Sequence, residues 1–208
     1  MSHHEIETAE PHYMLMFSSQ GESLLPQVSH VFAAFVKTTA GGEMNDRPVE
    51  AQCISWLPET LKVEPLHVTP EAGRNLSLAE TIQWAKDMNA RITMWGPFRI
   101  DQELYDMAIE QVERLNAKSV DYVMLDVFRA GRRATNCIHA VCDLDTTQKT
   151  LGTGILYGEP ASERILRHFE RYIIPSSEPM DWLVDRLGVR DGDIRQAEFK
   201  TVNVLEVY

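Results

Sequence analysis

The sequence predicts an α+β fold in which helices pack on an antiparallel sheet. Three apolar, β-rich segments come early in the chain, separated by loops rich in Gly, Pro, Ser, Asn and Asp, which is typical of an antiparallel meander. Helix caps followed by apolar residues at helical spacing then recur from Ser77 onward. Because 208 residues can bury most of their surface around one core, we expect a single domain over residues 12–208. The polar residues 1–11 before it are expected to be a disordered tail.

The three early segments are predicted strands. His12 to Ser18 is short and apolar, and Ser29 to Thr39 is apolar along almost its whole length. A strand that does not alternate is buried on both faces, so we expect the second segment near the centre of the sheet. Val49 to Leu57 follows a turn rich in Gly, Asn and Asp and should run back beside it.

The segment from Pro58 to Asn75 is predicted to be a long loop, because three prolines and Gly73 interrupt regular structure. Loops of that length are often functional. Ser77 and Glu80 have the spacing of a capping box, with an apolar stripe after them, and predict a helix that runs to about Met88.

The middle of the chain combines one strand with the clearest helical pattern. Arg91 to Phe98 is a predicted strand that ends at Gly96-Pro97, and Asp101 is the predicted cap of an amphipathic helix that reaches Asn116. Tyr122 to Phe128 fits either a strand or the end of a helical hairpin, because periodicity does not separate the two.

The last third of the sequence predicts three further helices. Asn136 is the expected cap of a helix from Cys137 to Leu144, and Pro160 the expected first turn of a helix to about Tyr172. The remaining predictions are a flexible stretch or short strand from Gly152 to Gly158, a short helix after Asp181 and a final strand from Thr201 to Tyr208.

Charge and composition exclude several classes of partner. The chain carries 31 acidic and 20 basic residues, which give a formal charge of −11. The only cluster of basic residues along the sequence is the short group of Arg129, Arg132 and Arg133. A phosphate backbone would be repelled at long range, so nucleic acid is not an expected partner. No apolar run approaches the ~20 residues of a membrane span, and the N-terminal residues do not resemble a signal peptide.

The cysteine content predicts reduced thiols. Cys53, Cys137 and Cys142 are an odd number and too few for a disulfide framework, which favours a cytoplasmic setting.

A phosphate-binding glycine motif is absent, since Gly152-Thr153-Gly154 lacks a third glycine and a following Lys-Ser or Lys-Thr. We therefore expect no nucleotide chemistry and no cofactor.

Cys137 is the strongest candidate for a catalytic residue. A thiol in the first turn of a helix lies near unpaired backbone N–H groups and the positive end of the helix dipole, both of which favour the thiolate. The same N–H groups can receive an oxyanion. A nucleophilic cysteine also needs a base, usually an imidazole that a third polar group orients.

His30 is the histidine best suited to act as that base. It opens the apolar strand Ser29 to Thr39, at the rim of the predicted sheet, where the Cys137 helix could pack. His139 is excluded as the base of Cys137, because two helical positions separate their side chains by about 200°. The returning strand brings either Gln52 or Ser55 to the imidazole, and Ser55 is favoured because the end of one strand opposes the start of its antiparallel neighbour.

These residues resemble the circularly permuted branch of the NlpC-type papain-like cysteine hydrolases. The resemblance consists of Ser29-His30-Val31 at the head of a core strand and Asn136-Cys137 at the head of a later helix. It implies a permuted papain-like architecture and a thiol-dependent hydrolase or acyltransferase that acts on an amide or ester of a peptide-like or lipid-like substrate. The Trp95 turn and the Pro58–Asn75 loop would shape the pocket.

The predicted catalytic residues are therefore Cys137, His30 and Ser55. The predicted substrate-binding residues are Trp95, Asn136 and Ser29. The alternative is a non-catalytic binding or scaffold protein of the same fold, in which Cys137 is buried and inert. Cys137, His139 and Cys142 also suggest zinc, but Cys137 and Cys142 would point about 140° apart on one helix, so no metal site is expected. The substrate and the oligomeric state stay open.

Overall fold

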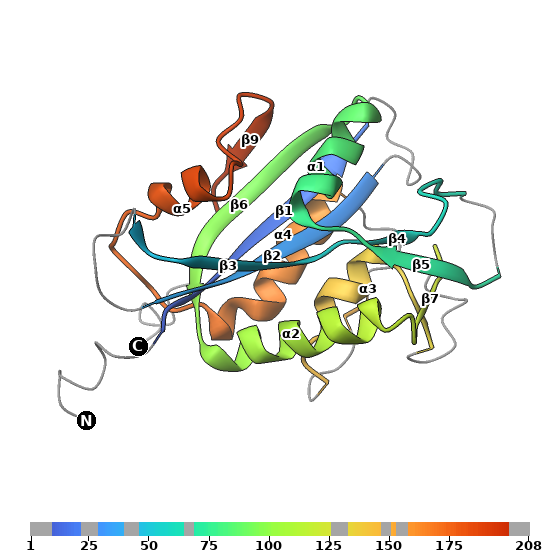
Figure 1. Cartoon of the computed structure of the whole chain (residues 1–208), viewed down its shortest axis with the longest axis horizontal. Helices are drawn as coiled ribbons and strands as arrows, with labels where there is room; N and C mark the ends of the chain where they lie inside the picture. The colour runs from blue at the N-terminus through green and yellow to red at the C-terminus, as the bar shows by residue number, and fades with distance from the viewer. Residues whose placement is uncertain are drawn as a thin grey trace.

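The structure is a computed structural model that describes residues 10–21, 29–39, 46–64, 69–125, 133–146, 151–152 and 158–199. It is an α+β fold with two sheets and helices on both faces of the larger one (Figure 1). The expected tail over residues 1–11 lies almost entirely outside the described residues, as does the predicted strand from Thr201 to Tyr208.

The larger sheet has the order β3-β2-β1-β6-β9. Its first three strands form the predicted antiparallel meander, and β6 then adds antiparallel to β1. The last strand, β9, pairs parallel to β6, so the expectation of a purely antiparallel sheet is wrong at this edge. The strands in chain order are β1 (His12–Gln20), β2 (Ser29–Thr38), β3 (Val49–Ile54), β6 (Arg91–Ile100) and β9 (Ile194–Ala197).

The smaller sheet has the order β4-β5-β7-β8 and includes part of the segment that was expected to be a loop. Its strand β5 (Glu71–Asn75) pairs antiparallel to β4 (Trp56–Pro58), while the two-residue strands β7 (Asp121–Tyr122) and β8 (Ala134–Thr135) are parallel. Gly73 lies in β5, and only glycine fits at this position, because a Cβ there would lie 2.0 Å from the Trp56 ring. A glycine that suggests a loop in the sequence thus permits close strand packing.

Three predicted helix starts are confirmed with their caps. Helix α1 (Leu78–Asp87) has the reciprocal capping box of Ser77 and Glu80, and Asp101 caps α2 (Gln102–Asn116) through the Leu104 N–H. Asn136 caps α3 (Cys137–Cys142), its side-chain oxygen accepting a hydrogen bond from the His139 N–H. Each side chain satisfies an N–H group that the first helical turn leaves unpaired.

The C-terminal elements follow the prediction with shifted boundaries. Helix α4 (Gly158–Phe169) begins two residues before Pro160, and a 3₁₀ turn, η4 (Glu170–Tyr172), extends it to the predicted end. Helix α5 (Asp181–Arg186) is the short helix expected in the tail. Strand β6 continues through Gly96-Pro97 to Ile100, beyond its predicted end. Residues 126–132 and 153–157 lie outside the described part of the chain.

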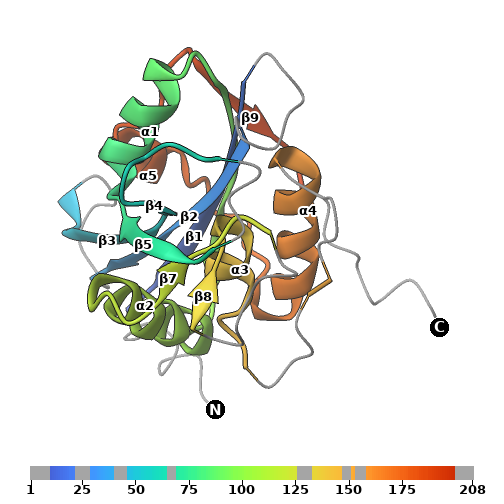
Figure 2. The same ribbon diagram turned by 90° about the vertical axis from the view of Figure 1, so that its right-hand side faces the viewer.

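Helices cover both faces of the larger sheet, and each face has its own apolar cluster. We name these the α3 face, which contacts α2, α3 and α4, and the α1 face, which contacts α1 and α5 (Figure 2). Strand β2 contributes to both because its side chains alternate: Val31, Ala33 and Phe35 lie on the α3 face, and Phe32, Ala34 and Val36 on the α1 face.

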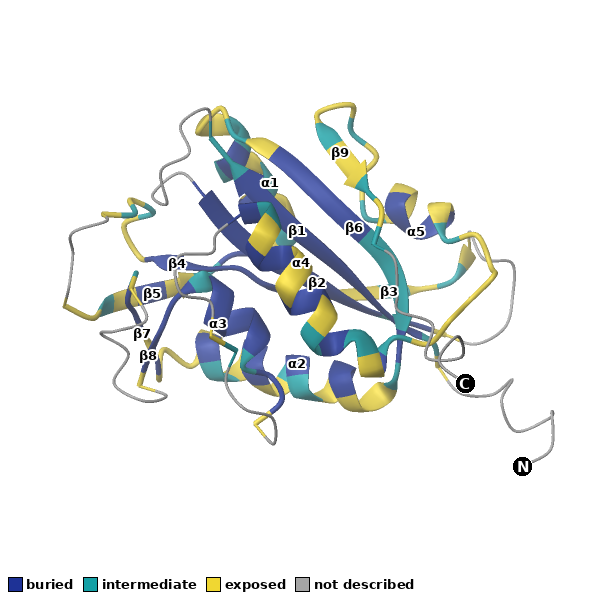
Figure 3. Ribbon diagram, turned by 180° about the vertical axis from the view of Figure 1, so that it is seen from behind, coloured by how far each residue is buried: buried dark blue, intermediate teal, exposed yellow. Residues whose placement is uncertain are grey.

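Burial on two faces explains why β2 is apolar throughout. The strands β1 and β2 are buried along nearly their whole length (Figure 3). Within the described ranges, every helix is too short or too polar to cross a membrane.

Candidate functional site

Cys137 is the first residue of α3, at the loop-to-helix junction that the sequence predicts. The helix packs against β2, β4 and α4, and the Cys137 side chain packs against the apolar cluster of the α3 face. Cys137 is half-buried, whereas Cys53 and Cys142 are buried. Of the three thiols in the chain, Cys137 is therefore the one with access to solvent.

Asn136 has a structural role in addition to its predicted place beside a substrate. Its side-chain oxygen caps α3, and its side-chain N–H donates to the Met124 backbone oxygen at 3.3 Å. Tyr122 interacts electrostatically with Cys137. Burial raises the pKa of Tyr122, and the negative charge of a Cys137 thiolate raises it further. The start of α3 is thus held against the β7 segment.

His30 and Ser55 are in contact, as the strand register suggests. The Nε2 atom of His30 lies 2.9 Å from the Ser55 Oγ atom, and both residues are buried. Ser55 is the residue between β3 and β4, where the chain passes from the larger to the smaller sheet. Its N–H donates to the Asn75 side-chain oxygen at 2.8 Å, and the Asn75 amide donates to the Cys53 carbonyl at 2.8 Å.

The surroundings of His30 make it a poor base for substrate chemistry. Its ring stacks on Phe32 at a centroid distance of 5.6 Å and lies edge-to-face to Trp84 at 5.4 Å. Burial lowers the pKa of His30 to about 3, because the imidazolium would lose its hydration. The Nδ1 atom is buried and has no hydrogen-bond partner among the described residues. His30 is therefore a neutral, enclosed side chain at physiological pH.

The structure places His30 and Cys137 on opposite faces of the larger sheet, so the predicted pairing of these two residues is wrong. His30 has the same strand parity as Phe32 and contacts Trp84 of α1, both on the α1 face. Cys137 packs on the α3 face. The intervening sheet separates their side chains, because successive residues of a strand point to opposite faces.

All three predicted substrate-binding residues are buried, Asn136 at the cap of α3 and the other two in the larger sheet. Trp95 is fully buried in the cluster of the α3 face, since β6 passes through the inside of the sheet beside β1, so Trp95 is not the wall of an open pocket. Ser29 lies on the α3 face at the start of β2 and is buried as well. Its Oγ atom would be 3.1 Å from a Cβ on Gly158, at the start of α4.

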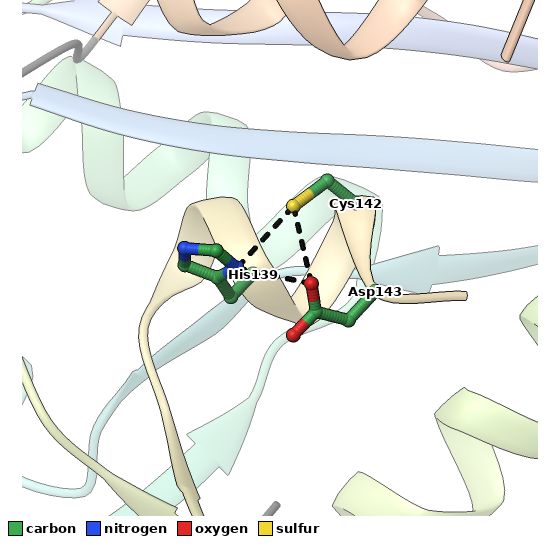
Figure 4. A group of neighbouring side chains, drawn as sticks. All are labelled: His139, Cys142 and Asp143. Atoms are coloured by element: carbon green, nitrogen blue, oxygen red, sulfur yellow. Dashed lines mark hydrogen bonds and ion pairs between the residues drawn. The ribbon is translucent and has the colours of Figure 1, made fainter. Parts of the chain in front are cut away.

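A second group of reactive side chains, which is not among the predicted site residues, lies on α3. His139 Nδ1 is 3.0 Å from Asp143 Oδ1, and Cys142 Sγ is 3.5 Å from each of these atoms. The three side chains point toward one another from the end of the helix (Figure 4). His139 and Cys142 are buried, and the Asp143 side chain is 14% exposed.

The spacing of this group could have predicted it. Positions 139, 142 and 143 are related by three and four residues, which places their side chains on one face of a helix. The expectation of no metal site rests on the angle between Cys137 and Cys142, which leaves out the combination of His139 with Cys142 and Asp143. That angle correctly separates Cys137 from the group, but it leaves the group itself untested.

Comparisons with known proteins add no family assignment. No protein-family model matches the chain, and searches of curated proteins and of solved structures give no significant match. The likeness to the permuted NlpC-type hydrolases therefore rests on Ser29-His30-Val31 and Asn136-Cys137 alone.

Proposed function

We propose that the chain is a thiol-dependent hydrolase or acyltransferase in which Cys137 is the nucleophile. The observation that carries this proposal is that Cys137 alone among the three thiols is not buried. A nucleophile must reach a carbonyl carbon, and it must form a thiolate at an accessible pH. Burial raises the pKa of Cys53 to about 12, so only about one molecule in 10⁵ would carry that thiolate at neutral pH.

The position of Cys137 supports the same chemistry. It occupies the first turn of α3, where backbone N–H groups stabilise a thiolate and then the oxyanion of a tetrahedral intermediate. The Asn136 side chain, which accepts the His139 N–H at 2.9 Å, fixes the start of the helix and with it the position of Cys137. We also propose a permuted papain-like architecture, supported by an early antiparallel meander against which a late cysteine-bearing helix packs.

The proposed reaction is acyl transfer through a thioester. The Cys137 thiolate forms a bond to the carbonyl carbon of an amide or ester, and the amine or alcohol leaves with the proton that the thiol gave up. Water or a second nucleophile then breaks the thioester and restores the thiol. The base in this scheme is a group other than His30, whose contact with Ser55 joins β2 to the β3–β4 junction.

Alkylation of the folded protein tests the proposal. Iodoacetamide, followed over pH and mapped by mass spectrometry, should modify Cys137 first, with an apparent pKa below the ~8.5 of a free thiol. Cys137→Ala should abolish the fast phase and the release of p-nitrophenolate from p-nitrophenyl acetate. Cys53→Ala should retain both.

His30→Asn separates this scheme from a His30–Cys137 pair. The proposal expects the pH profile of Cys137 alkylation to be unchanged in the folded variant, whereas a catalytic pair requires a slower reaction at neutral pH. A Cys137 pKa at or above ~8.5, without ester turnover, would instead indicate a binding or scaffold protein with an inert thiol.

A further inference from the structure

We propose that His139, Cys142 and Asp143 form a zinc-binding site at the C-terminal end of α3. The three side chains offer one nitrogen, one sulfur and one oxygen donor, and all three converge on one region of the helix surface (Figure 4). Zinc is bound in proteins by these three donor types, and three protein ligands with a fourth position held by water is a common arrangement. The proposal is independent of the role of Cys137.

The donor separations fit one face of a tetrahedral zinc site. At bond lengths of about 2.3 Å to sulfur and about 2.1 Å to nitrogen or oxygen, tetrahedral geometry requires about 3.6 Å for the sulfur pairs and about 3.4 Å for the N···O pair. The sulfur atom of Cys142 lies 3.5 Å from both other donors. The His139–Asp143 pair, at 3.0 Å, needs to open by about 0.4 Å, a shift that side-chain rotation supplies.

Charge balance favours a dication in this position. Bound through a thiolate, a carboxylate and a neutral imidazole, Zn²⁺ yields a site with no net charge. A neutral site is the form that burial tolerates, because an unpaired charge loses its hydration. His139 and Cys142 are both buried, at 2% and 1% exposure. The mixture of sulfur and nitrogen donors disfavours Mg²⁺ and Ca²⁺, which prefer oxygen.

The surrounding packing holds the helix that carries the three donors. The Gln111 amide of α2 donates to the Ala140 carbonyl at 2.9 Å, and the Asn136 cap secures the other end of α3. Just beyond the donors, Asp145 accepts hydrogen bonds from Arg171 and from the Tyr172 hydroxyl, so the segment after α3 is tied to η4. Donors held on a packed helix lose little freedom when an ion binds.

Proton balance makes the affinity dependent on pH. Binding replaces the Cys142 S–H bond with a zinc–sulfur bond and releases that proton to solvent. A neutral His139 binds through Nδ1 with its proton on Nε2, and therefore releases none. The affinity should rise about tenfold per pH unit wherever Cys142 is a thiol in the metal-free protein.

The test uses the full chain, stripped with a chelator and then titrated with Zn²⁺ against a chromophoric competitor. We expect one Zn²⁺ per chain, and Co²⁺ in its place should give tetrahedral ligand-field bands and a thiolate charge-transfer band. His139→Ala and Cys142→Ser should lose the bound ion, and Asp143→Asn, which keeps the shape of the side chain, should weaken it. Circular dichroism confirms that each variant is folded.

Cys137→Ser is the matched control, a cysteine of the same helix outside the donor group. It should retain full Zn²⁺ stoichiometry and the cobalt charge-transfer band. The proposal is overturned if the wild-type chain binds no Zn²⁺, which would leave a hydrogen-bonded cluster, or if Cys137→Ser loses the ion as Cys142→Ser does.

Discussion

Acid sensitivity caused by His30 is a direct consequence of its enclosure. The folded chain holds its pKa at about 3, while in the unfolded chain it returns to 6.5. Above pH 6.5 both states are neutral, and the full stability is present. As the pH falls from 6.5 toward 3, only the unfolded chain binds the proton, so the free energy of unfolding decreases by about 1.4 kcal/mol per pH unit. At about pH 5 the loss is about 2 kcal/mol.

The contribution of His30 can be isolated with His30→Asn, whose amide does not titrate. At about pH 8 the variant should be destabilised by roughly 2–4 kcal/mol, because it loses packing against Phe32 and Trp84. His12 and His168 also have pKa values lowered by burial, so both proteins become less stable in acid. The quantity of interest is the difference between the two losses.

Urea unfolding followed by tryptophan fluorescence at about pH 8 and about pH 5 measures that difference. The wild type should lose about 2 kcal/mol more than His30→Asn over this interval. Equal losses in the two proteins would show that His30 is hydrated or paired with a charge, and the account of an enclosed imidazole would be wrong.

Two further substitutions test how the fold is held. Gly73→Ala should destabilise the chain by at least about 1–3 kcal/mol, since its Cβ would overlap the Trp56 ring, whereas Gly192→Ala, with no atom within 4 Å, should leave the melting temperature nearly unchanged. Ser77→Ala removes the oxygen that accepts the Glu80 N–H at the start of α1 and should cost about 1 kcal/mol in urea unfolding. A Gly73→Ala protein as stable as Gly192→Ala, or an unchanged Ser77→Ala midpoint, would contradict these contacts.

Features that depend on neighbouring residues could be predicted well from the sequence. The caps at Ser77, Asp101 and Asn136 were identified because a capping side chain and the N–H that it accepts are only two or three residues apart. The first three strands and their antiparallel order could be predicted for a similar reason, since turn-forming residues separate three consecutive apolar segments in the sequence. The parallel pairing of β9 with β6 joins segments about a hundred residues apart, and no local pattern announces it.

The candidate site was predicted only in part, because a site depends on which faces meet. The contact of His30 with Ser55 follows from strand register and was expected. The pairing of His30 with Cys137 also required a choice of face. The β2 segment is apolar on both sides, so its pattern shows that His30 and Phe32 share a face but not which helices cover it.

By itself the sequence determined most of the helices and the early strands, the helix caps, the central two-sided strand and the net negative charge of the chain. Tertiary structure alone decided that α3 and α1 cover opposite faces of the larger sheet, that Trp95 is enclosed, and that β5 packs its glycine on Trp56. The physical reason is the distance in sequence over which each interaction acts. Helix caps and hydrophobic periodicity depend on residues a few positions apart, whereas the face of the sheet that each helix covers depends on the packing of the whole core.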